Sequence, residues 1–481
     1  MNKALRNMWL VSAAVFVLLL ASLTYIQFFS AKSLSANQWN SRTMYENYGS
    51  QRGAIVVDGK VIASSVPSQD GYDYQRSYAS PEAYAPVTGY FSSIYGATGL
   101  ESAMNEELTG TADSQFYDRL AQMFTSGSAK GATVELTLNA QLQELSYSLL
   151  QGHKGAIAAI NPKTGEVLAL ASSPSYDPNT LSSHNNESVL AQYQKLSSDP
   201  ANPLFNRAIG GNTYSPGSTF KIIDAVAALE SGKYTADSVI PNPQEYKLPG
   251  TNTMLPNYVN GQCSTRNQAT IEWALAQSCN TPFAQIGVEL GQDTMSKTAQ
   301  NFGYGDSSLS IPLSVSESVF PQNMTQSQLA QAAIGQYDVR TTPLQVAMTS
   351  AAIANDGVQM KPNMIRSVKS QSLNSLYEFS AQHLRTSTSP EVAHQVKDWM
   401  VNDVDNGIAS AASVPGVKVA GKTGTAEIGN SGLNNAWFTG FAPADDPQIA
   451  LAVVYEGVDT AEGASLAAPA AQQIFEAVLN K

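Results

Sequence analysis

The sequence predicts an α+β protein: one antiparallel sheet covered by helices, a smaller mixed, β-rich N-terminal module, and one N-terminal transmembrane helix. Three observations predict this fold class. No charged residue occurs from Trp9 to Phe29, apolar strands occur near both ends of the remaining chain, and helical stretches lie between those strands. Strands separated in this way by helices form one sheet with helices packed on it, which is an α+β layer design.

The N-terminal stretch is long enough to cross a bilayer. As a helix, residues 9–29 would span about 31 Å. Lys3 and Arg6 precede it, which places the N-terminus in the cytoplasm and the rest of the chain outside. A cleaved signal peptide is the alternative, but its apolar core is usually only ~7–15 residues long. We therefore expect a cytoplasmic tail at residues 1–8 and an uncleaved anchor at residues 9–29.

The rest of the chain divides into two parts. Residues 53–63 predict a β-hairpin, because two β-branched runs flank Asp58-Gly59. Residues 125–131 are rich in serine and glycine and predict a linker. We expect a membrane-proximal module at 30–130 and a larger domain at 131–481, with strands at 134–138, 155–160, 166–172, 417–427, 436–441 and 449–455, and helices at 140–150, 270–277, 283–290 and 466–480.

Composition excludes several function classes. The chain of 481 residues has 27 Lys and Arg against 39 Asp and Glu, a net charge of −12, whereas nucleic-acid binding needs a basic face. The four histidines are scattered without metal spacing, and no G-x-S-x-G occurs. We therefore expect no nucleic acid, no metal ion, no cofactor and no histidine-based serine hydrolase.

A serine and a lysine begin a helix that we expect to be buried. Ser218 and Lys221 are three residues apart, so their side chains share a helix face, and apolar residues surround the helix that follows. A desolvated lysine near another cation loses its proton easily and can act as a base toward serine. This S-x-x-K is the only one in the chain. The alternative is a serine N-cap followed by a lysine that reaches solvent.

A second motif could face the same cleft as Ser218 and Lys221. Ser278 and Asn280 lie on a turn between two expected helices, with Pro282 at the first position of the second helix. Alone, S-x-N is a weak signal, since it also begins at Ser35, Ser183 and Ser372, and Asn280 could simply cap the helix.

A lysine on a C-terminal strand forms the third motif. Lys422-Thr423-Gly424-Thr425 offers a cation, two hydroxyls on one strand face and a glycine that permits close approach, which suits a substrate carboxylate. The same letters at Lys163-Thr164-Gly165 form a hairpin turn, where we expect the lysine to be solvated.

The two cysteines leave a choice open. Cys263 and Cys279 could form a disulfide outside the membrane or remain two buried thiols, because spacing alone does not give their geometry.

The order Ser218, Ser278, Lys422 resembles the transpeptidase domain of class B penicillin-binding proteins, and the short anchor-plus-ectodomain plan is most similar to the actinobacterial penicillin-binding protein A family. Further similar segments are Gln51-Arg52-Gly53-Ala54-Ile55, Gly96-Ala97-Thr98-Gly99-Leu100-Glu101, Asn206-Arg207-Ala208, Gly335-Gln336 and Thr342-Pro343-Leu344-Gln345-Val346-Ala347. Departures are Ser215, where a second proline is common, and an insertion-like stretch at 182–204.

The resemblance implies a penicillin-binding transpeptidase fold, with a five-stranded antiparallel sheet, and a pedestal-like or dimerisation module at 30–130. It also implies a serine-type D-Ala-D-Ala transpeptidase that cross-links peptidoglycan stem peptides through an acyl-enzyme and is acylated by beta-lactams. The resemblance implies that Ser218 is the nucleophile, that Lys221 is its base and that Ser278 relays a proton. It implies that Asn280 contacts the substrate amide and that Lys422 supplies a positive field. It also implies that Thr423 and Thr425, beside Gly424, bind the carboxylate, and that the N–H groups of Ser218 and Thr425 form an oxyanion hole.

Other readings share parts of this pattern. A D,D-carboxypeptidase or a serine beta-lactamase would release the acyl group to water, and a beta-lactam sensor or a division scaffold would not turn over peptidoglycan. A sensor needs a sizeable cytoplasmic domain, and only about eight residues precede the anchor. We expect a single-pass cell-membrane protein with an extracellular catalytic domain, active in cell division or cell shape, whose partners are stem peptides ending in D-Ala-D-Ala and membrane proteins of division or elongation.

Overall fold

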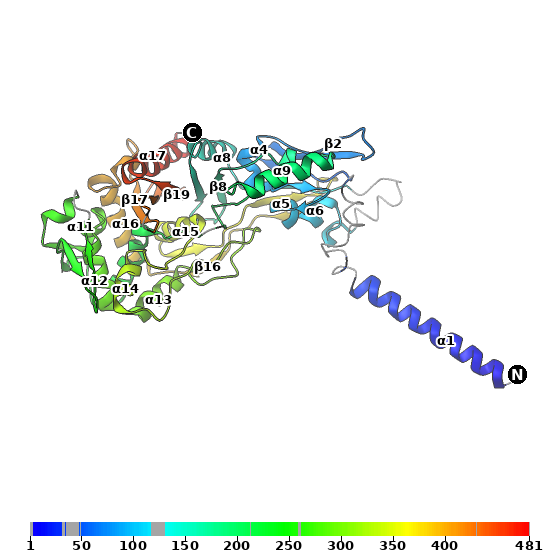
Figure 1. The fold of residues 1–481 in the computed structure, drawn as a ribbon, viewed down its shortest axis with the longest axis horizontal. Helices are drawn as coiled ribbons and strands as arrows, with labels where there is room; N and C mark the ends of the chain where they lie inside the picture. The colour runs from blue at the N-terminus through cyan, green and yellow to red at the C-terminus, as the bar shows by residue number, and fades with distance from the viewer. Residues whose placement is uncertain are drawn as a thin grey trace.

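The computed structural model describes residues 3–30, 34, 48, 50–116, 130–211, 213–257, 261–429 and 431–480. Most of the expected linker at 125–131 lies outside these residues. Figure 1 shows an elongated body from which a single helix projects at the N-terminal end.

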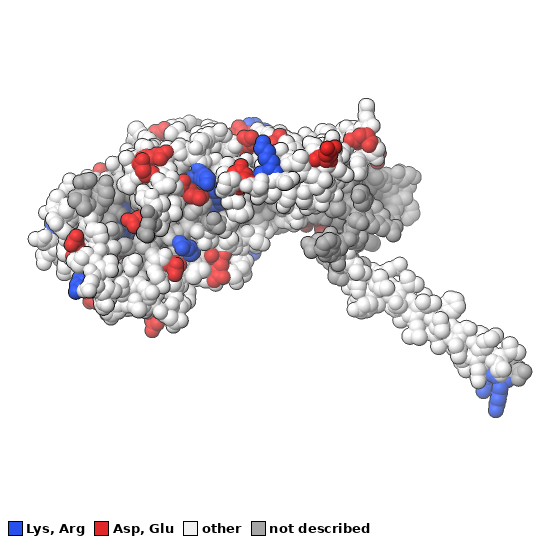
Figure 2. All heavy atoms as spheres, viewed as in Figure 1, with Lys and Arg blue, Asp and Glu red and all other residues white. Residues whose placement is uncertain are grey.

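The projecting helix includes the residues that are expected to form the anchor. α1 (Lys3–Thr24) continues into a π-helical turn (Tyr25–Phe29), and none of its residues is buried. Its mean hydropathy reaches 2.2 over an 18-residue window, which makes it long and apolar enough to cross a membrane. In Figure 2 basic side chains are seen only at its free end, where Lys3 and Arg6 lie.

The N-terminal module is built on a six-stranded sheet. Its strand order is β15 (Ser375–Glu378), β14 (Ile365–Lys369), β6 (Thr133–Leu136), β1 (Ile55–Val57), β2 (Lys60–Pro67) and β3 (Tyr74–Tyr78). β1 and β2 form the expected hairpin, and Asp58 and Gly59 have φ of 47° and 75°. Two positive φ values suit the tight turn between twisted strands.

One expected strand belongs to a different sheet from the one predicted. The stretch at 134–138 was expected in the sheet of the larger domain, but β6 pairs in parallel with β1 and antiparallel with β14. The six-stranded sheet therefore takes strands from both sides of residue 131. An apolar run indicates a strand but not the strand's partner.

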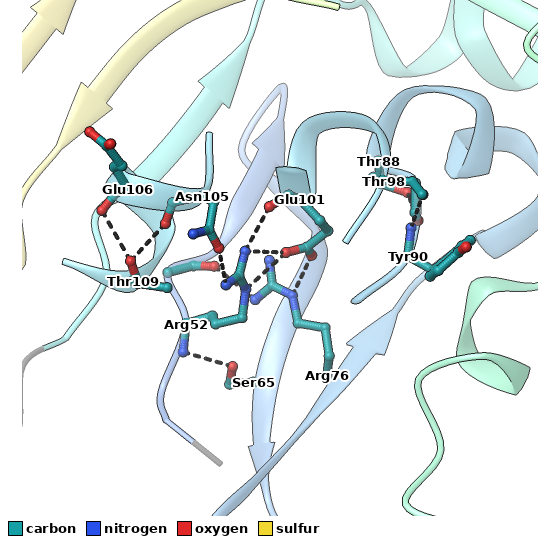
Figure 3. Close-up of polar contacts among 12 residues, drawn as sticks. Arg52, Ser65, Arg76, Thr88, Tyr90, Thr98, Glu101, Asn105, Glu106 and Thr109 are labelled. Atoms are coloured by element: carbon teal, nitrogen blue, oxygen red, sulfur yellow. Dashed lines mark hydrogen bonds and ion pairs between the residues drawn. The ribbon is translucent and has the colours of Figure 1, made fainter. Parts of the chain in front are cut away.

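A buried ion cluster holds the N-terminal module together (Figure 3). Glu101, in α5 (Gly99–Ala103), accepts hydrogen bonds from Arg52 Nε at 3.0 Å and Arg76 Nε at 2.6 Å, and all three side chains are buried. Burial raises the pKa of Glu101, but the charges of Arg76 and Arg52 outweigh burial and lower it below its ordinary value. The cluster joins two of the segments that carried the family resemblance.

The main sheet has the five antiparallel strands expected, in the order β17 (Ala420–Glu427), β18 (Asn434–Ala442), β19 (Ile449–Val458), β7 (Lys154–Ile160) and β8 (Val167–Ser173). Alternate residues of β7 enter two different apolar clusters: Ala156 and Ala158 in one, Ile157 and Ala159 in the other. α15 (Pro343–Ala354) contributes to the first cluster and α17 (Thr460–Leu479) to the second, whereas α8 (Ala140–Leu149) contributes Ala140 to the first and Leu142 to the second. Helices thus cover both faces.

A group of helices beside this sheet surrounds α10 (Lys221–Glu230). α11 (Ile271–Ala276), α12 (Asn280–Leu290), α13 (Gln292–Asn301) and α16 (Pro390–Asn406) pack against it. Pro282 is the third residue of α12, not the first as predicted, because the helix begins at Asn280. α10 ends before Gly232, whose φ of 68° suits a residue just beyond the end of a helix.

Further helices and short strand pairs occur in the residues that the structure describes. The helices are α4 (Pro81–Thr88), α6 (Asn105–Thr109), α9 (Asn186–Ser198) and α14 (Gln326–Ala333), and the short strand pairs are β4 (Phe91–Ser92) with β5 (Gly96–Ala97), β9 (Val239–Pro241) with β12 (Gln268–Thr270), β10 (Glu245–Lys247) with β11 (Met254–Pro256) and β13 (Val358–Met360) with β16 (His383–Thr386).

Candidate active site

Ser218 lies at the point where the chain enters the buried helix. It belongs to a 3-10 turn, Gly217–Phe220, directly before α10. Residues 221–228 of α10 are buried, as are Thr219 and Phe220, whereas Ser218 itself is half-buried. The turn therefore leaves Ser218 accessible while the helix behind it is enclosed.

Glycines allow three segments to meet around this turn. A Cβ on Gly217 would lie 2.5 Å from the carbonyl O of Thr425, and a Cβ on Gly335 would lie 2.1 Å from the carbonyl O of Gly217. A Cβ on Gly424 would lie 2.9 Å from Thr219 Cγ2. Such contacts are too short for any side chain. The turn is thus held between β17 and the segment containing Gly335.

Lys221 connects the first motif to the second. Its Nζ donates hydrogen bonds to the carbonyl O of Ser278 at 2.8 Å and to Asn280 Oδ1 at 2.9 Å. Burial lowers the pKa of Lys221 well below its ordinary value, and the charge of Lys422 lowers it further, against the opposing carboxylates of Asp224 and Asp403. A neutral amine has two N–H groups and one lone pair. The two hydrogen bonds use both N–H groups, so the lone pair can accept a proton.

Hydrogen bonds and a disulfide fix the turn that carries Ser278. Ser278 has φ of 57°, in the left-handed region. Asn257 Oδ1 accepts hydrogen bonds from the backbone N–H of Asn280 at 2.7 Å and of Thr281 at 3.1 Å. The fully buried Cys279 forms a disulfide with Cys263, which settles the choice that the sequence left open. These contacts fix the two acceptors of Lys221.

Lys422 is paired with a residue that sequence analysis did not find. Its Nζ lies 3.0 Å from Asp403 Oδ2, and both side chains are fully buried. Burial raises the pKa of Asp403 to about 6, against the lowering effect of Lys422. A signal was present, because Asp403 falls on the apolar stripe of α16 with Val396 and Met400. A carboxylate on such a stripe requires a buried partner.

The threonines of the third motif lie on the other side of β17 from Lys422, since side chains alternate along a strand. Thr425 is exposed and Thr423 is half-buried. Thr423 Oγ1 is buried and has no hydrogen-bond partner among the described residues, so a ligand could use it. Lys163, in the second Lys-Thr-Gly, is half-exposed on its turn and pairs with the exposed Asp446, as a solvated lysine does.

The chain matches two family models. Residues 155–476 match the penicillin-binding protein transpeptidase domain, and residues 52–134 match the penicillin-binding protein A dimerisation domain. Over 492 residues, covering 100% of both chains, it is 38% identical to the peptidoglycan D,D-transpeptidase PbpA of Mycolicibacterium smegmatis.

Solved structures agree with the family models. The crystal structure of PBPA from Mycobacterium tuberculosis superposes with a TM-score of 0.86 at 39% identity, covering 90% of this chain and 100% of that one. The penicillin G acyl-enzyme complex of the same protein gives a TM-score of 0.85 at 39% identity, with 89% and 99% covered. Together with the shared fold, these matches show that the chain belongs to the penicillin-binding protein transpeptidase family and is of the penicillin-binding protein A type.

Proposed function

We propose that this chain is a peptidoglycan D,D-transpeptidase that cross-links stem peptides through an acyl-enzyme on Ser218. The observation that carries the proposal is the buried amine of Lys221, whose two hydrogen bonds to the Ser278 turn leave a lone pair free. The full-length similarity to a named peptidoglycan D,D-transpeptidase supports the substrate class. Beta-lactams acylate the same serine in this proposal, in keeping with the penicillin G acyl-enzyme of the M. tuberculosis relative.

Acylation begins with proton transfer from Ser218 Oγ to Lys221 Nζ, while Oγ attacks the carbonyl carbon between the last two D-alanines. The N–H groups of Ser218 and Thr425 hold the resulting oxyanion. When the tetrahedral intermediate collapses, the bond to the terminal D-alanine nitrogen breaks. The proton taken by Lys221 passes through the hydroxyl of Ser278 to that nitrogen, and D-alanine leaves.

The remaining groups hold the substrate. Thr423 and Thr425, beside Gly424, bind the terminal carboxylate, and Asn280 binds the peptide amide. Lys422 supplies a positive field that favours the neutral form of Lys221. Every step uses groups of the chain and the substrate, so the proposal requires no metal ion and no cofactor.

The second half of the reaction needs an amine. An amino group of a neighbouring stem peptide attacks the ester carbonyl, and its proton returns to Ser218 Oγ as the cross-link forms. Water at this step would make the chain a D,D-carboxypeptidase. Product analysis with and without an amine acceptor separates the two activities.

We place the catalytic domain outside the cell membrane, with residues 1–8 as a cytoplasmic tail, 9–29 as the anchor, 30–130 as the membrane-proximal module and 131–481 as the transpeptidase domain. Lys3 and Arg6 before the apolar helix support this orientation. The Cys263–Cys279 disulfide also supports it, because disulfides persist in oxidising compartments. An anchored ectodomain of this kind is suited to membrane partners of cell division or elongation.

Labelling with a fluorescent penicillin tests the proposal. We expect the purified ectodomain to form a long-lived adduct, Ser218→Ala and Lys221→Ala to form none, and Ser372→Ala, on an exposed turn, to label normally. Labelling of Ser218→Ala would overturn the assignment of the nucleophile. Rapid hydrolysis of penicillin would identify a beta-lactamase instead, and normal growth on Ser218→Ala as sole copy would identify a scaffold.

A further inference from the structure

A second buried carboxyl lies in the helix that carries Lys221. Asp224 is fully buried, and neither of its carboxyl oxygens has a hydrogen-bond partner within the part of the chain that the structure describes. Buried polar groups are almost always hydrogen-bonded, and an unpartnered carboxyl is costly. The mechanism above assigns no role to Asp224, so its position requires an explanation.

The geometry places this carboxyl beside the base. Asp224 follows Lys221 by three residues in α10, so both side chains lie on one helix face. Helical side chains also lean toward the N-terminus, which directs Asp224 toward the turn that carries Lys221. The amine of Lys221 is bound elsewhere, to Ser278 and Asn280. Without a hydrogen bond between them, an effect of Asp224 on Lys221 must be electrostatic, and charges in a buried region are weakly screened.

Two other buried charges act on Lys221: Lys422 lowers its pKa and Asp403 raises it. Besides Lys221, Asp224 is coupled to Tyr234, which follows the helix. α16 contributes Asp403, which is paired with Lys422 of β17. The other titratable side chains on the helices around α10 are exposed or half-buried: Glu272 on α11, Glu289 on α12, Asp293 and Lys297 on α13, and Glu391, His394, Lys397, Asp398 and Asp405 on α16.

Burial acts on the two groups in opposite directions. It lowers the pKa of Lys221 and raises the pKa of Asp224, and the charge of each group opposes the effect of burial on the other. Each charge therefore favours the ionised form of the other group. Any ionised fraction of Asp224 holds a proton on Lys221.

We propose that Asp224 is a positioning residue that acts through Lys221: its carboxyl maintains the basicity of the amine and so sets the lowest pH at which Ser218 is acylated. A general base is most effective when it loses its proton near the working pH. Burial and Lys422 both weaken the base, and Asp224 opposes them. The inference rests on the proposed function of the Ser218 site.

Asp224→Asn tests the proposal, because it removes the charge and keeps the shape. Without the negative charge, protonated Lys221 is less stable, so the amine becomes neutral at a lower pH. We expect the acid limb of the rate of acylation by a fluorescent penicillin to move to lower pH, by on the order of one pH unit. We also expect the plateau rate to fall, because the base is weaker.

Asp293→Asn, on the exposed side of α13, is the matched control, and its profile should coincide with that of the native chain. A purely structural role for Asp224 would lower the rate equally at every pH, and an unshifted acid limb in Asp224→Asn would overturn the proposal. Failure of the proposed function looks different, since Ser218→Ala would then still be labelled.

A second measurement does not depend on the folding of Asp224→Asn. The charge of Lys221 favours ionisation of Asp224. In Lys221→Ala, the infrared carbonyl band of a protonated buried carboxylic acid should therefore persist to higher pH than in the native chain. The same titration in both proteins would show that the two groups are uncoupled and would also overturn the proposal.

Discussion

Lys422 Nζ lies 3.0 Å from Asp403 Oδ2 in the interior of the protein, with neither side chain exposed to solvent. The pair joins β17 to α16, and the charges of both residues act on the buried amine of Lys221. Lys422 therefore favours the neutral form of Lys221, and Asp403 favours its protonated form. The site acts as a set of buried charges rather than as isolated motif residues.

Lys422→Ala tests whether the positive charge of Lys422 acts on Lys221. Without the positive charge, Lys221 keeps its proton to higher pH. We expect acylation by a fluorescent penicillin at neutral pH to fall by on the order of 10²-fold or more, with its acid limb moved to higher pH. Asp403 is also left unpaired, and breaking a buried pair costs about 3–5 kcal/mol of unfolding free energy.

The second Lys-Thr-Gly provides the control for this change. Lys163→Ala removes a lysine from the same three letters on a half-exposed turn, so acylation and its pH profile should remain as in the native chain. An acid limb that stays in place in folded Lys422→Ala would show that Lys422 does not act on Lys221.

Much of this site is predictable because its parts are local. Each motif combines residue types with a turn or strand that short-range sequence determines, and the hydrogen bonds of Lys221 show that two of these motifs meet. Asp403 and Asp224 were not predicted as part of the site, since a single carboxylate in a helix carries no pattern that identifies its partner. Only the packing of α10, α16 and β17 reveals what they face.

The fold, like the site, has local parts that the sequence predicts and long-range contacts that it does not. Apolar runs predicted four of the five strands of the main sheet, β7, β8, β18 and β19, whereas the fifth, β17, is the strand that carries Lys422. The partners of β6 were not predictable, since β1 and β14 reach it from distant parts of the chain. Pairing of this kind depends on long-range packing, which periodicity does not record.

Gly217→Ala tests the close approach behind the nucleophile. A Cβ at this position would lie 2.5 Å from the carbonyl O of Thr425, and φ is 54°. The turn or β17 must then move, so we expect acylation to be nearly abolished and thermal stability to fall. The melting temperature and the rate of penicillin labelling measure both effects.

Gly232→Ala, at the other end of the same helix, is the matched control. Gly232 has φ of 68°, but a Cβ there would meet no atom within 4 Å. This variant should lose only the about 1–2 kcal/mol of unfolding free energy that a left-handed backbone costs, and it should label normally. Equal losses in the two variants would show that backbone strain, not contact with β17, makes Gly217 necessary.

Glu101→Gln tests the ion cluster of the N-terminal module. Arg76 and Arg52 hold the pKa of Glu101 below its ordinary value of 4.5 in the folded chain. The stabilisation is therefore fully present above the unfolded pKa and is lost as pH falls through the folded pKa. Glu101→Gln leaves two buried guanidinium groups without a carboxylate, at a cost of about 3–5 kcal/mol near pH 7.

Urea unfolding of both proteins from neutral to acidic pH gives the measurement. The difference in unfolding free energy should be constant near pH 7 and should shrink as pH falls below about 4.5. Glu106→Gln, on the neighbouring helix α6, controls for the loss of one acidic charge in the same module. A difference that does not change with pH would mean that the ionisation of Glu101 contributes nothing to the stability of the cluster.

The Cys263–Cys279 disulfide links stability to catalysis in one place. Cys279 lies between Ser278 and Asn280, which hold the amine of Lys221. Replacing both cysteines by serine releases a cross-link across 16 residues and should cost about 3 kcal/mol of unfolding free energy. Because the acceptors of Lys221 then move more freely, we expect acylation by a fluorescent penicillin to slow by on the order of tenfold.

Reduction of the native chain must give the same result as the double substitution if the cross-link itself is responsible. The free-thiol protein should label slowly and recover when it is reoxidised, whereas the double-serine variant should not respond to reductant. Unchanged labelling after complete reduction, confirmed by thiol titration, would contradict the prediction. The hydrogen bonds of Asn257 to the backbone of Asn280 and Thr281 would then be sufficient to hold the turn.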